Sequence, residues 1–238
     1  MVERASPRAE NGAVLALDTA SPRVSVAVAR GERVLAQREG AQRESSAQLV
    51  GWIDTVLGEA GLVLPDLAGA VAASGPGSFT GLRVGLATLL GFHQALGIAV
   101  TGIPTLALLA AAAPPGRRIA AVVPAGPGEW FVQRYDTDWP PGALDEPRRV
   151  PVADLAALAP TVERLVTATD DEAMRLHDLR CPIHVAGPLA PVAARLASLH
   201  PPVWDASKLS APLYLAPAPV SVPGAPKPVM PVANGTRS

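Results

Sequence analysis

The chain has 238 residues, of which 49% are hydrophobic and 17% are charged, and its formal net charge is −1. A chain of this length can bury a substantial core, and we expect one large domain or two smaller ones. The composition excludes a disordered chain. The nearly balanced charge excludes a protein that holds nucleic acid by electrostatics alone, so the isolated chain should bind RNA weakly.

The sequence shows no sign of export or membrane insertion. Residues 1–12 lack the apolar segment of a signal peptide, and the longest apolar stretches are shorter than the roughly 20 residues that cross a bilayer. Cys181 is the single cysteine, so it cannot form an internal disulfide, and no cluster of basic residues surrounds it in the sequence that would lower its pKa. We expect a cytoplasmic protein without a membrane span, in which Cys181 is an inert buried thiol.

The N-terminal part predicts an antiparallel meander. Residues 14–18 form an apolar run, and residues 25–29 and 33–38 are rich in strand-forming side chains. The turn around Asp18 joins the first two predicted strands, and a short link with Gly31 joins the next two.

Two helices are predicted after this meander. Leu49, Trp52, Ile53 and Val56 have the spacing of one helical face, and Gly61 is a typical C-terminal cap, so we expect an amphipathic helix over residues 45–60. A short buried strand, 70–73, leads through a Gly-rich loop to a second helix, 82–96. This helix is apolar on nearly every side, which predicts that it is covered on both faces.

A strand at 98–101 and a helix at 105–113, with Pro104 at its first position, complete the order β-β-β-α-β-α-β-α. Residues 114–116, Pro-Pro-Gly, mark the expected domain boundary. Beyond it we expect strands at 119–123, 130–135 and 183–186 and a helix at 191–199. The predicted units are a flexible tail (1–12), an N-terminal lobe (13–113), a C-terminal lobe (117–220) and a flexible Pro- and Gly-rich tail (221–238).

The Gly-rich loop is the first candidate site. Glycines let a ligand approach the backbone, hydroxyl groups can bind it, and the following helix directs free N–H groups at the loop. The sequence is neither a Walker A loop nor a dinucleotide fingerprint. An anion site and a tight strand-to-helix turn are equally good interpretations. The candidate residues are Gly75, Gly77, Ser78, Thr80, Gly81 and Arg83.

Asp18 and Thr19 follow the first predicted strand and form the second candidate site. A carboxylate there could bind a metal–phosphate group, but an Asx-turn that stabilises the bend is favoured because no lysine or second carboxylate accompanies it.

The histidines stand singly, without metal-binding spacing, so we expect no metal site. Ser45 and Ser46 are interpreted as a helix N-cap rather than as catalytic serines. The four histidines are His93, His177, His184 and His200.

Several segments resemble the TsaB family, also called YeaZ: LALDTA at 15–20, SVAV at 25–28, SGPGSFTGLRVG at 74–85 and TGIPTL at 101–106. The run GPGSFTGLRVG is the most specific of them. The resemblance covers about residues 14–112, and weaker family signatures occur at 128–131 and 212–215. It implies an α/β fold of the actin-like ATPase (RNase H-like) class, with two lobes that each contain a mixed β-sheet flanked by helices.

The resemblance implies a non-catalytic scaffold in the synthesis of N6-threonylcarbamoyladenosine in tRNA. The implied partner is the catalytic subunit TsaD, with a TsaE-type ATPase in the complex, tRNA bound only through the complex, and a homodimer as an alternative assembly. In TsaD two histidines ligate a metal, and the matching positions here are Thr105 and Leu109. We therefore expect no catalytic residue and no intrinsic cofactor, although ATP or ADP could bind at the subunit interface.

The resemblance also implies that the two long helices pair with those of a partner. The expected interface residues are Leu49, Trp52, Ile53, Val84, Gly85, Thr88, Gly91 and Ala95. Together with Gly81, the small ones among them form a stripe that permits close helix approach. An Ala- and Leu-rich core helix is the alternative explanation of the second helix.

The chain also departs from the family. Ser45 stands where many relatives carry a histidine, and residues 124–126, Pro-Ala-Gly, stand where relatives carry an Asp-Ala-Arg-like stretch, which argues against a nucleotide contact in the second lobe.

Two alternative functions compete with the scaffold role. One is a small-molecule kinase or ATPase that uses Asp18 and the Gly-rich loop, and the other is a glycoprotease-like peptidase, for which the sequence has neither a metal motif nor a triad.

Overall fold

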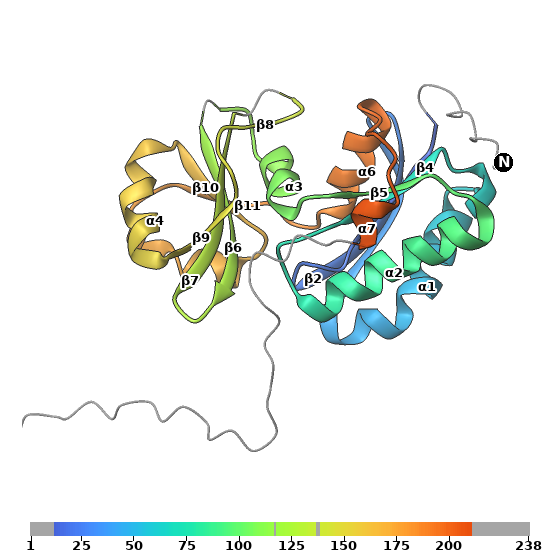
Figure 1. Cartoon of the computed structure of the whole chain (residues 1–238), viewed down its shortest axis with the longest axis horizontal. Helices are drawn as coiled ribbons and strands as arrows, with labels where there is room; N and C mark the ends of the chain where they lie inside the picture. The colour runs from blue at the N-terminus through green and yellow to red at the C-terminus, as the bar shows by residue number, and fades with distance from the viewer. Residues whose placement is uncertain (1–11, 117, 137–138, 211–238) are drawn as a thin grey trace, which may run out of the picture.

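A computed structural model describes residues 12–116, 118–136 and 139–210, with the backbone alone at 42–47. The chain forms two lobes that lie side by side, each built on one β-sheet (Figure 1). This arrangement confirms the expected α/β class with two mixed sheets flanked by helices. Within the described residues, no helix combines the length and the apolar character needed to cross a bilayer.

The first sheet has five strands in the order β3-β2-β1-β4-β5. β1 pairs antiparallel with β2 and parallel with β4, so that Leu15 lies between Val28 and Ala70. The three N-terminal strands thus form the expected meander, and the other two run parallel to β1. The strands are β1 (Val14–Asp18), β2 (Arg23–Arg30), β3 (Arg33–Ala41), β4 (Gly69–Ala73) and β5 (Val100–Ile103).

Two long helices cover one face of this sheet: α1 (Gln42–Glu59) and α2 (Phe79–Leu96). Leu49, Ile53 and Val56 of α1 and Leu82 and Leu89 of α2 are buried in the core cluster of the lobe. The short helix α7 (Ser207–Ser210) packs beside α2 and β5. The apolar periodicity of both long helices is therefore explained by their contact with the sheet.

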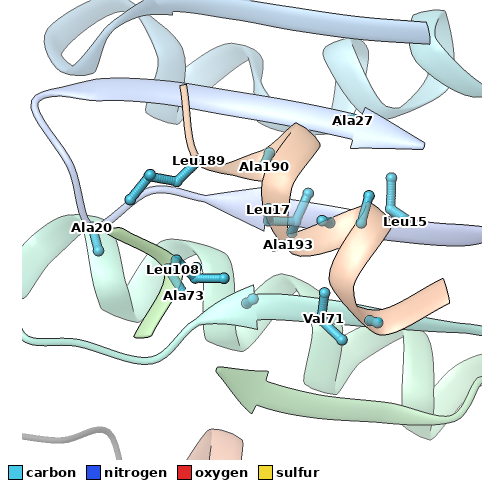
Figure 2. Packing of buried hydrophobic residues seen from close by; sticks show 14 of the residues in the cluster. Leu15, Leu17, Ala20, Ala27, Val71, Ala73, Leu108, Leu189, Ala190 and Ala193 are labelled. Atoms are coloured by element: carbon cyan, nitrogen blue, oxygen red, sulfur yellow. The ribbon is translucent and has the colours of Figure 1, made fainter. Parts of the chain in front are cut away.

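The opposite face is covered by α6 (Ala190–Leu199), which comes from the C-terminal part of the chain and packs against β1, β2 and β4 (Figure 2). Its alanines lie directly on the strands, because Ala193, Ala194 and Ala197 are buried. Two serines fix its ends. The Ser25 Oγ accepts a hydrogen bond from the Ala190 N–H at 3.1 Å, and the Ser198 Oγ accepts one from the Gly31 N–H at 2.7 Å.

The second sheet has the order β11-β10-β6-β7-β8, and β9 also pairs with β7. The central strands are β6 (Ile119–Gly126), β7 (Glu129–Asp136) and β10 (Arg164–Thr167); the outer ones are β8 (Gly142–Ala143), β9 (Arg148–Pro151) and β11 (Ile183–Val185). Alternate residues of β6 face opposite sides of the sheet. Ala120 and Val122 pack with Leu155 of α4 (Val152–Leu158), whereas α3 (Thr105–Ala112) covers the other side.

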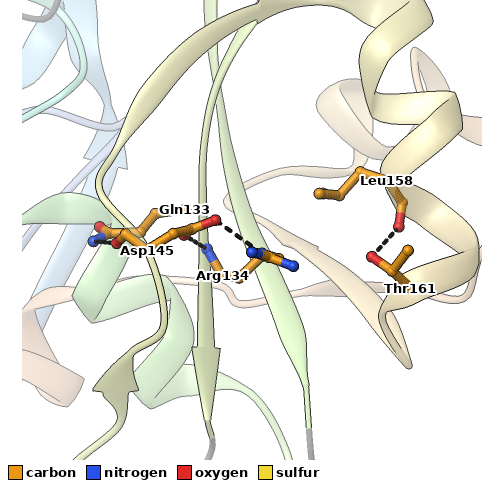
Figure 3. Close-up of polar contacts among 5 residues, drawn as sticks. All are labelled: Gln133, Arg134, Asp145, Leu158 and Thr161. Carbon is orange, nitrogen blue, oxygen red and sulfur yellow. Dashed lines mark hydrogen bonds and ion pairs between the residues drawn. The ribbon is translucent and has the colours of Figure 1, made fainter.

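Polar contacts fix the chain that follows β8 (Figure 3). The Asp145 carboxylate accepts hydrogen bonds from the Arg134 N–H and the Arg134 Nε–H, both at 2.8 Å, and the Asp145 carbonyl accepts one from the Gln133 side chain at 2.7 Å. The Thr161 hydroxyl donates to the Leu158 carbonyl at 2.7 Å and closes the turn after α4. That turn is the 3₁₀ helix η2 (Ala159–Thr161); η1 (Leu64–Asp66) and η3 (His177–Leu179) are the others described.

The predicted element order of the N-terminal part is confirmed, and the boundaries differ in three places. α1 begins at Gln42, so Ser45 lies within its first turns and the predicted N-cap at Ser45 and Ser46 is wrong. α2 begins at Phe79 because Ser78 caps it. The strand expected at 98–101 runs from Val100 to Ile103.

The division of the lobes along the chain also differs from the expected ranges. α6 and α7 fall within 117–220 but pack on the first sheet, and α3, from the range 13–113, packs between the second sheet and α6.

Two features of the sequence lie outside the described residues: the expected tails at 1–11 and 221–238, and the signature at 212–215. The short elements β8, β9, β10, α4 and α5 (Asp170–Met174) were not predicted.

Candidate functional site

The Gly-rich loop packs directly on the turn between β1 and β2. The Ser78 N–H donates to the Ala20 carbonyl at 2.8 Å. A Cβ on Gly77 would lie 2.6 Å from that carbonyl oxygen, and a Cβ on Gly85 would lie 2.3 Å from the Thr19 Oγ1. A Cβ essentially never lies this close to a non-bonded atom, so the contact between the two segments requires both glycines.

The hydrogen-bonding groups of the loop are used within the fold. The Ser78 Oγ accepts a hydrogen bond from the Gly81 N–H at 3.2 Å and so caps α2. The Gly75 carbonyl accepts one from the Thr105 N–H at 2.7 Å. Gly75 and Gly81 are buried, whereas Thr80 and Arg83 are exposed, with the Arg83 guanidinium 4.2 Å from the centre of the Phe79 ring. This geometry corresponds to the tight strand-to-helix turn rather than to an open anion site.

Asp18 forms the Asx-turn that the sequence favoured. Its Oδ1 accepts hydrogen bonds from the Ala20 N–H at 3.0 Å and the Ser21 N–H at 3.2 Å. Its Oδ2 has no hydrogen-bond partner within the described part of the chain, and the side chain is 0% exposed. Burial raises the pKa of Asp18 to about 6, and the negative charge of Glu172 adds to this shift.

The positions that match the metal-binding histidines of TsaD are part of the core. Thr105 and Leu109 of α3 are both buried. His184 contacts the Ala112 carbonyl at 3.3 Å, and His93 contacts the Ile98 carbonyl at 2.8 Å, so both bind backbone oxygens. Across residues 12–116, 118–136 and 139–210, the side chains described include no group of three or more His, Cys, Asp or Glu residues that could hold a metal ion.

Cys181 is half-buried in the second lobe, next to its smaller core cluster. Burial raises the pKa of its thiol. A raised pKa lowers the thiolate fraction, which agrees with the predicted inert thiol.

Three of the expected interface residues face the core of the chain itself. Leu49 is 1% exposed, Ile53 is 2% exposed, and Gly85 is covered by Thr19. Their apolar or small character is fully explained by packing within the first lobe, so we remove them from the candidate interface. Gly81 is also buried, so the proposed stripe does not continue over this part of α2.

The outer side of α1 and α2 presents a different set of residues. Val50 is 62% exposed, and Ala87, Gly91 and Ala95 are exposed on α2. Val84, Thr88 and Trp52 are half-buried. We call the following residues the outer helix surface: Val50, Gly51, Gly58, Val84, Ala87, Thr88, Gly91 and Ala95. Val50, Gly51, Gly58 and Ala87 were not predicted, because the inner apolar residues dominate the periodicity of both helices.

Three glycines on this surface are not required by any contact with the described residues. A Cβ on Gly51, Gly58 or Gly91 would meet no atom within 4 Å, and none of these residues has a positive φ. They lie inside helices, where glycine is unfavourable. These positions contrast with Gly77 and Gly85, which the fold requires.

A separate pocket of about 510 Å³ lies where the two lobes meet. The first lobe contributes residues from the start of β2 and the end of β3, and the second lobe contributes Thr169, Asp170 and Asp171 at the start of α5. None of the predicted site residues lines this pocket. No local pattern in the sequence indicates this pocket, because its lining residues come from segments far apart in the chain.

Comparisons with known proteins agree with these observations. Residues 30–138 match a family model described as TsaD, tRNA N6-adenosine threonylcarbamoyltransferase. The tRNA threonylcarbamoyladenosine biosynthesis protein TsaB of Escherichia coli is 30% identical over 128 residues, which cover 52% of this chain and 55% of that protein. An uncharacterized protein of Mycobacterium tuberculosis is 37% identical over 106 residues, 42% of this chain and 48% of that protein. The chain thus spans about half the length of the curated relatives it matches.

Solved structures support the fold. A Pseudomonas aeruginosa protein described as similar to peptidase YEAZ aligns with a TM-score of 0.72 and 22% identity, over 86% of this chain and all of that chain. YeaZ from Pseudomonas aeruginosa aligns with a TM-score of 0.66, over 78% of this chain and 91% of that chain. The chain is thus similar in sequence to TsaB proteins over about half of their length, and it shares its fold with the two YeaZ-like structures.

Proposed function

We propose that the chain is a non-catalytic scaffold subunit in the synthesis of N6-threonylcarbamoyladenosine in tRNA, and that it binds a TsaD-type threonylcarbamoyltransferase through the outer helix surface. The names of its relatives support the pathway. The observation that carries the proposed binding surface is the set of exposed helical glycines, Gly51, Gly58 and Gly91, which no contact with the structurally described part of the chain requires.

A glycine inside a helix lowers stability by about 1 kcal/mol relative to alanine. The contacts at Gly77 and Gly85 explain that cost, but the surroundings of Gly51, Gly58 and Gly91 do not. Glycines on an outer helix face allow the backbone of another helix to approach closely, and exposed Val50 supplies apolar area beside them. A stable interface needs about 800 Å² from each partner, which two helices of 18 residues can provide.

Further features of the assembly are part of the same proposal. A TsaE-type ATPase would join the complex, ATP or ADP would bind at the subunit interface, and tRNA would bind through the complex because the chain has a net charge of only −1. A homodimer would use the same outer helix surface when the partner is absent. All of this would take place in the cytoplasm.

The alternative functions receive no support from the geometry of the candidate residues. A kinase or ATPase would need Asp18 to reach a metal–phosphate group, but Asp18 is buried and its Oδ1 is used in the turn. The Gly-rich loop binds the β1–β2 turn through Ser78 and caps α2. The peptidase alternative likewise has no observation in its favour.

The decisive experiment is co-elution of the purified chain with a TsaD-type subunit. Val84→Arg should weaken association on the order of 100-fold, because an unpaired charge would be buried against the partner. Val203→Arg is the matched control, since Val203 is 79% exposed and lies outside the outer helix surface. Unchanged co-elution of Val84→Arg would overturn the assigned surface.

Reconstitution tests the function separately from the surface. The catalytic subunits should form more N6-threonylcarbamoyladenosine with the chain than without it, and the Val84→Arg variant should lose this effect. Equal product in the presence and absence of the chain would contradict the scaffold role. ATP turnover by the isolated chain that Asp18→Ala abolishes would instead favour the kinase.

A further inference from the structure

The described part of the chain ends beside the outer helix surface. Its last helix, α7, packs against α2 and β5 (Figure 1). The Lys208 carbonyl oxygen lies 3.6 Å from the place that a Cβ on Gly102 would take, and Gly102 pairs with Ala72 next to the end of β4. Because α2 begins at this edge of the sheet, the chain leaves Ser210 near the first half of α2.

The sequence that follows Ser210 favours burial. Residues 211–223 contain no charged side chain, and Leu213, Tyr214 and Leu215 form a run of large, mainly apolar residues. Removing such side chains from water is favourable. A proline-rich sequence has few conformations to lose, so it binds in an extended form at a low cost in entropy. Prolines recur here at positions 212, 217, 219 and 223.

The outer side of α2 offers a surface that suits an extended apolar segment. Val84 is half-buried, and Ala87, Gly91 and Ala95 are exposed, so this stripe is uncharged and has only small side chains beyond Val84. The Thr88 hydroxyl in the same stripe donates to the Val84 carbonyl at 2.8 Å and therefore already has a partner within the helix. An apolar chain can cover this stripe without leaving a hydroxyl group unsatisfied.

The length of the following segment is sufficient to reach this stripe. An extended, proline-rich backbone advances about 3.1 Å per residue, so residues 211–219 span about 28 Å. A helix with its side chains is about 10–12 Å wide. Since the chain leaves Ser210 beside α2, these residues can cross the helix and lie over it from Val84 to Gly91.

We propose that residues 212–219 dock on the outer side of α2, over Val84, Ala87 and Gly91, and cover the outer helix surface while no partner is bound. The segment is tethered next to its own binding surface, which gives it a high effective concentration there. A partner that uses this surface must displace the segment, so the segment lowers the affinity of the chain for that partner. The competition with a TsaD-type subunit rests on the proposed function, whereas the contact itself does not.

The test measures how fast a maleimide labels Ala87→Cys in the full chain, in a Cys181→Ser background without a partner. Leu213→Ser, Tyr214→Ser and Leu215→Ser, introduced together, should raise the labelling rate on the order of tenfold, because the tethered segment no longer covers the site. Equal rates with and without these three substitutions would overturn the contact. Protection that increases with protein concentration would also overturn it, since the covering segment would then belong to a second copy.

Two controls accompany this measurement. Val229→Ser with Met230→Ser removes apolar side chains farther along the same segment and should leave the labelling rate of Ala87→Cys unchanged. Met174→Cys lies in the second lobe, where Met174 is 68% exposed, and should react at the same rate in every variant. A rate at Met174→Cys that rises together with the rate at Ala87→Cys would indicate a general loss of structure and would overturn the assignment to α2.

Addition of a TsaD-type subunit separates this proposal from the proposed function. The partner should protect Ala87→Cys in both chains and should bind the variant with the three serines several-fold more tightly. Equal affinity for both chains would overturn the competition. A partner that leaves Ala87→Cys unprotected would contradict the proposed binding surface, while the difference in labelling without a partner would still support the docked segment.

Discussion

Small residues occur on two helical regions of the first lobe, but for different reasons. On α6, Ala193, Ala194 and Ala197 are buried against the sheet, and two serine hydrogen bonds hold the ends of the helix in place. On the outer helix surface, a Cβ added to Gly51 or Gly91 would meet no atom of the described residues within 4 Å. The comparison shows that a small residue indicates an interface only after the contacts of its own chain have been accounted for.

The largest expected effect is a loss of stability that distinguishes the inner side of α1 from its outer side. Ile53→Ala should lower the free energy of unfolding by about 2–5 kcal/mol, because the side chain is 2% exposed and its removal leaves a cavity. Val50→Ala, on the exposed side of the same helix, should change it by no more than about 0.5 kcal/mol. Urea denaturation followed by circular dichroism measures both. Similar losses for the two variants would mean that the inner and outer sides have been assigned wrongly.

A smaller effect is expected where α2 meets the β1–β2 turn. The added methyl group of Gly85→Ala would lie 2.3 Å from the Thr19 Oγ1, so the variant should lose about 1–3 kcal/mol of stability through overpacking. Thermal denaturation of the isolated chain measures this loss. If the variant is as stable as the original chain, the close contact of helix and turn is not present in solution.

The smallest expected effect is a gain in stability rather than a loss. Gly91→Ala should stabilise the isolated chain by up to about 1 kcal/mol, because alanine is the better helix former and nothing lies within 4 Å of the new methyl group. The same variant should weaken binding to a TsaD-type partner. A melting curve and a binding titration on one preparation separate the two effects. A variant that is stabilised and binds normally would show that Gly91 is not needed for close approach.

Much of the first lobe could be predicted from the sequence because its signals are local. Apolar runs of strand-forming residues and the apolar face of α1 mark their elements, and Gly61, with φ of 65°, ends α1 as expected. The second lobe was harder to predict. β8 has two residues and α5 has five, and such short elements carry too few residues for a period to be recognised.

The candidate sites could likewise be predicted only where the signal in the sequence is local. Asp18 was found because it follows an obvious strand, and its Asx-turn was correctly favoured. Glu172 was missed, since its carboxylate is bound by Thr167, the last residue of an unpredicted strand, and by the N–H of Ala168, which follows that strand. Leu49 and Ile53 were assigned to a partner because the periodicity of a helix gives its apolar face but not the molecule that covers it.

The position of α6 has a consequence for synthesis on the ribosome. β2 ends at Arg30, but the helix that shields its second face begins at Ala190. At 5–20 residues per second, roughly 10–30 s separate their emergence. During that interval the nascent meander carries an uncovered apolar side, so the early part of this polypeptide is protected from aggregation only after α6 has been synthesised.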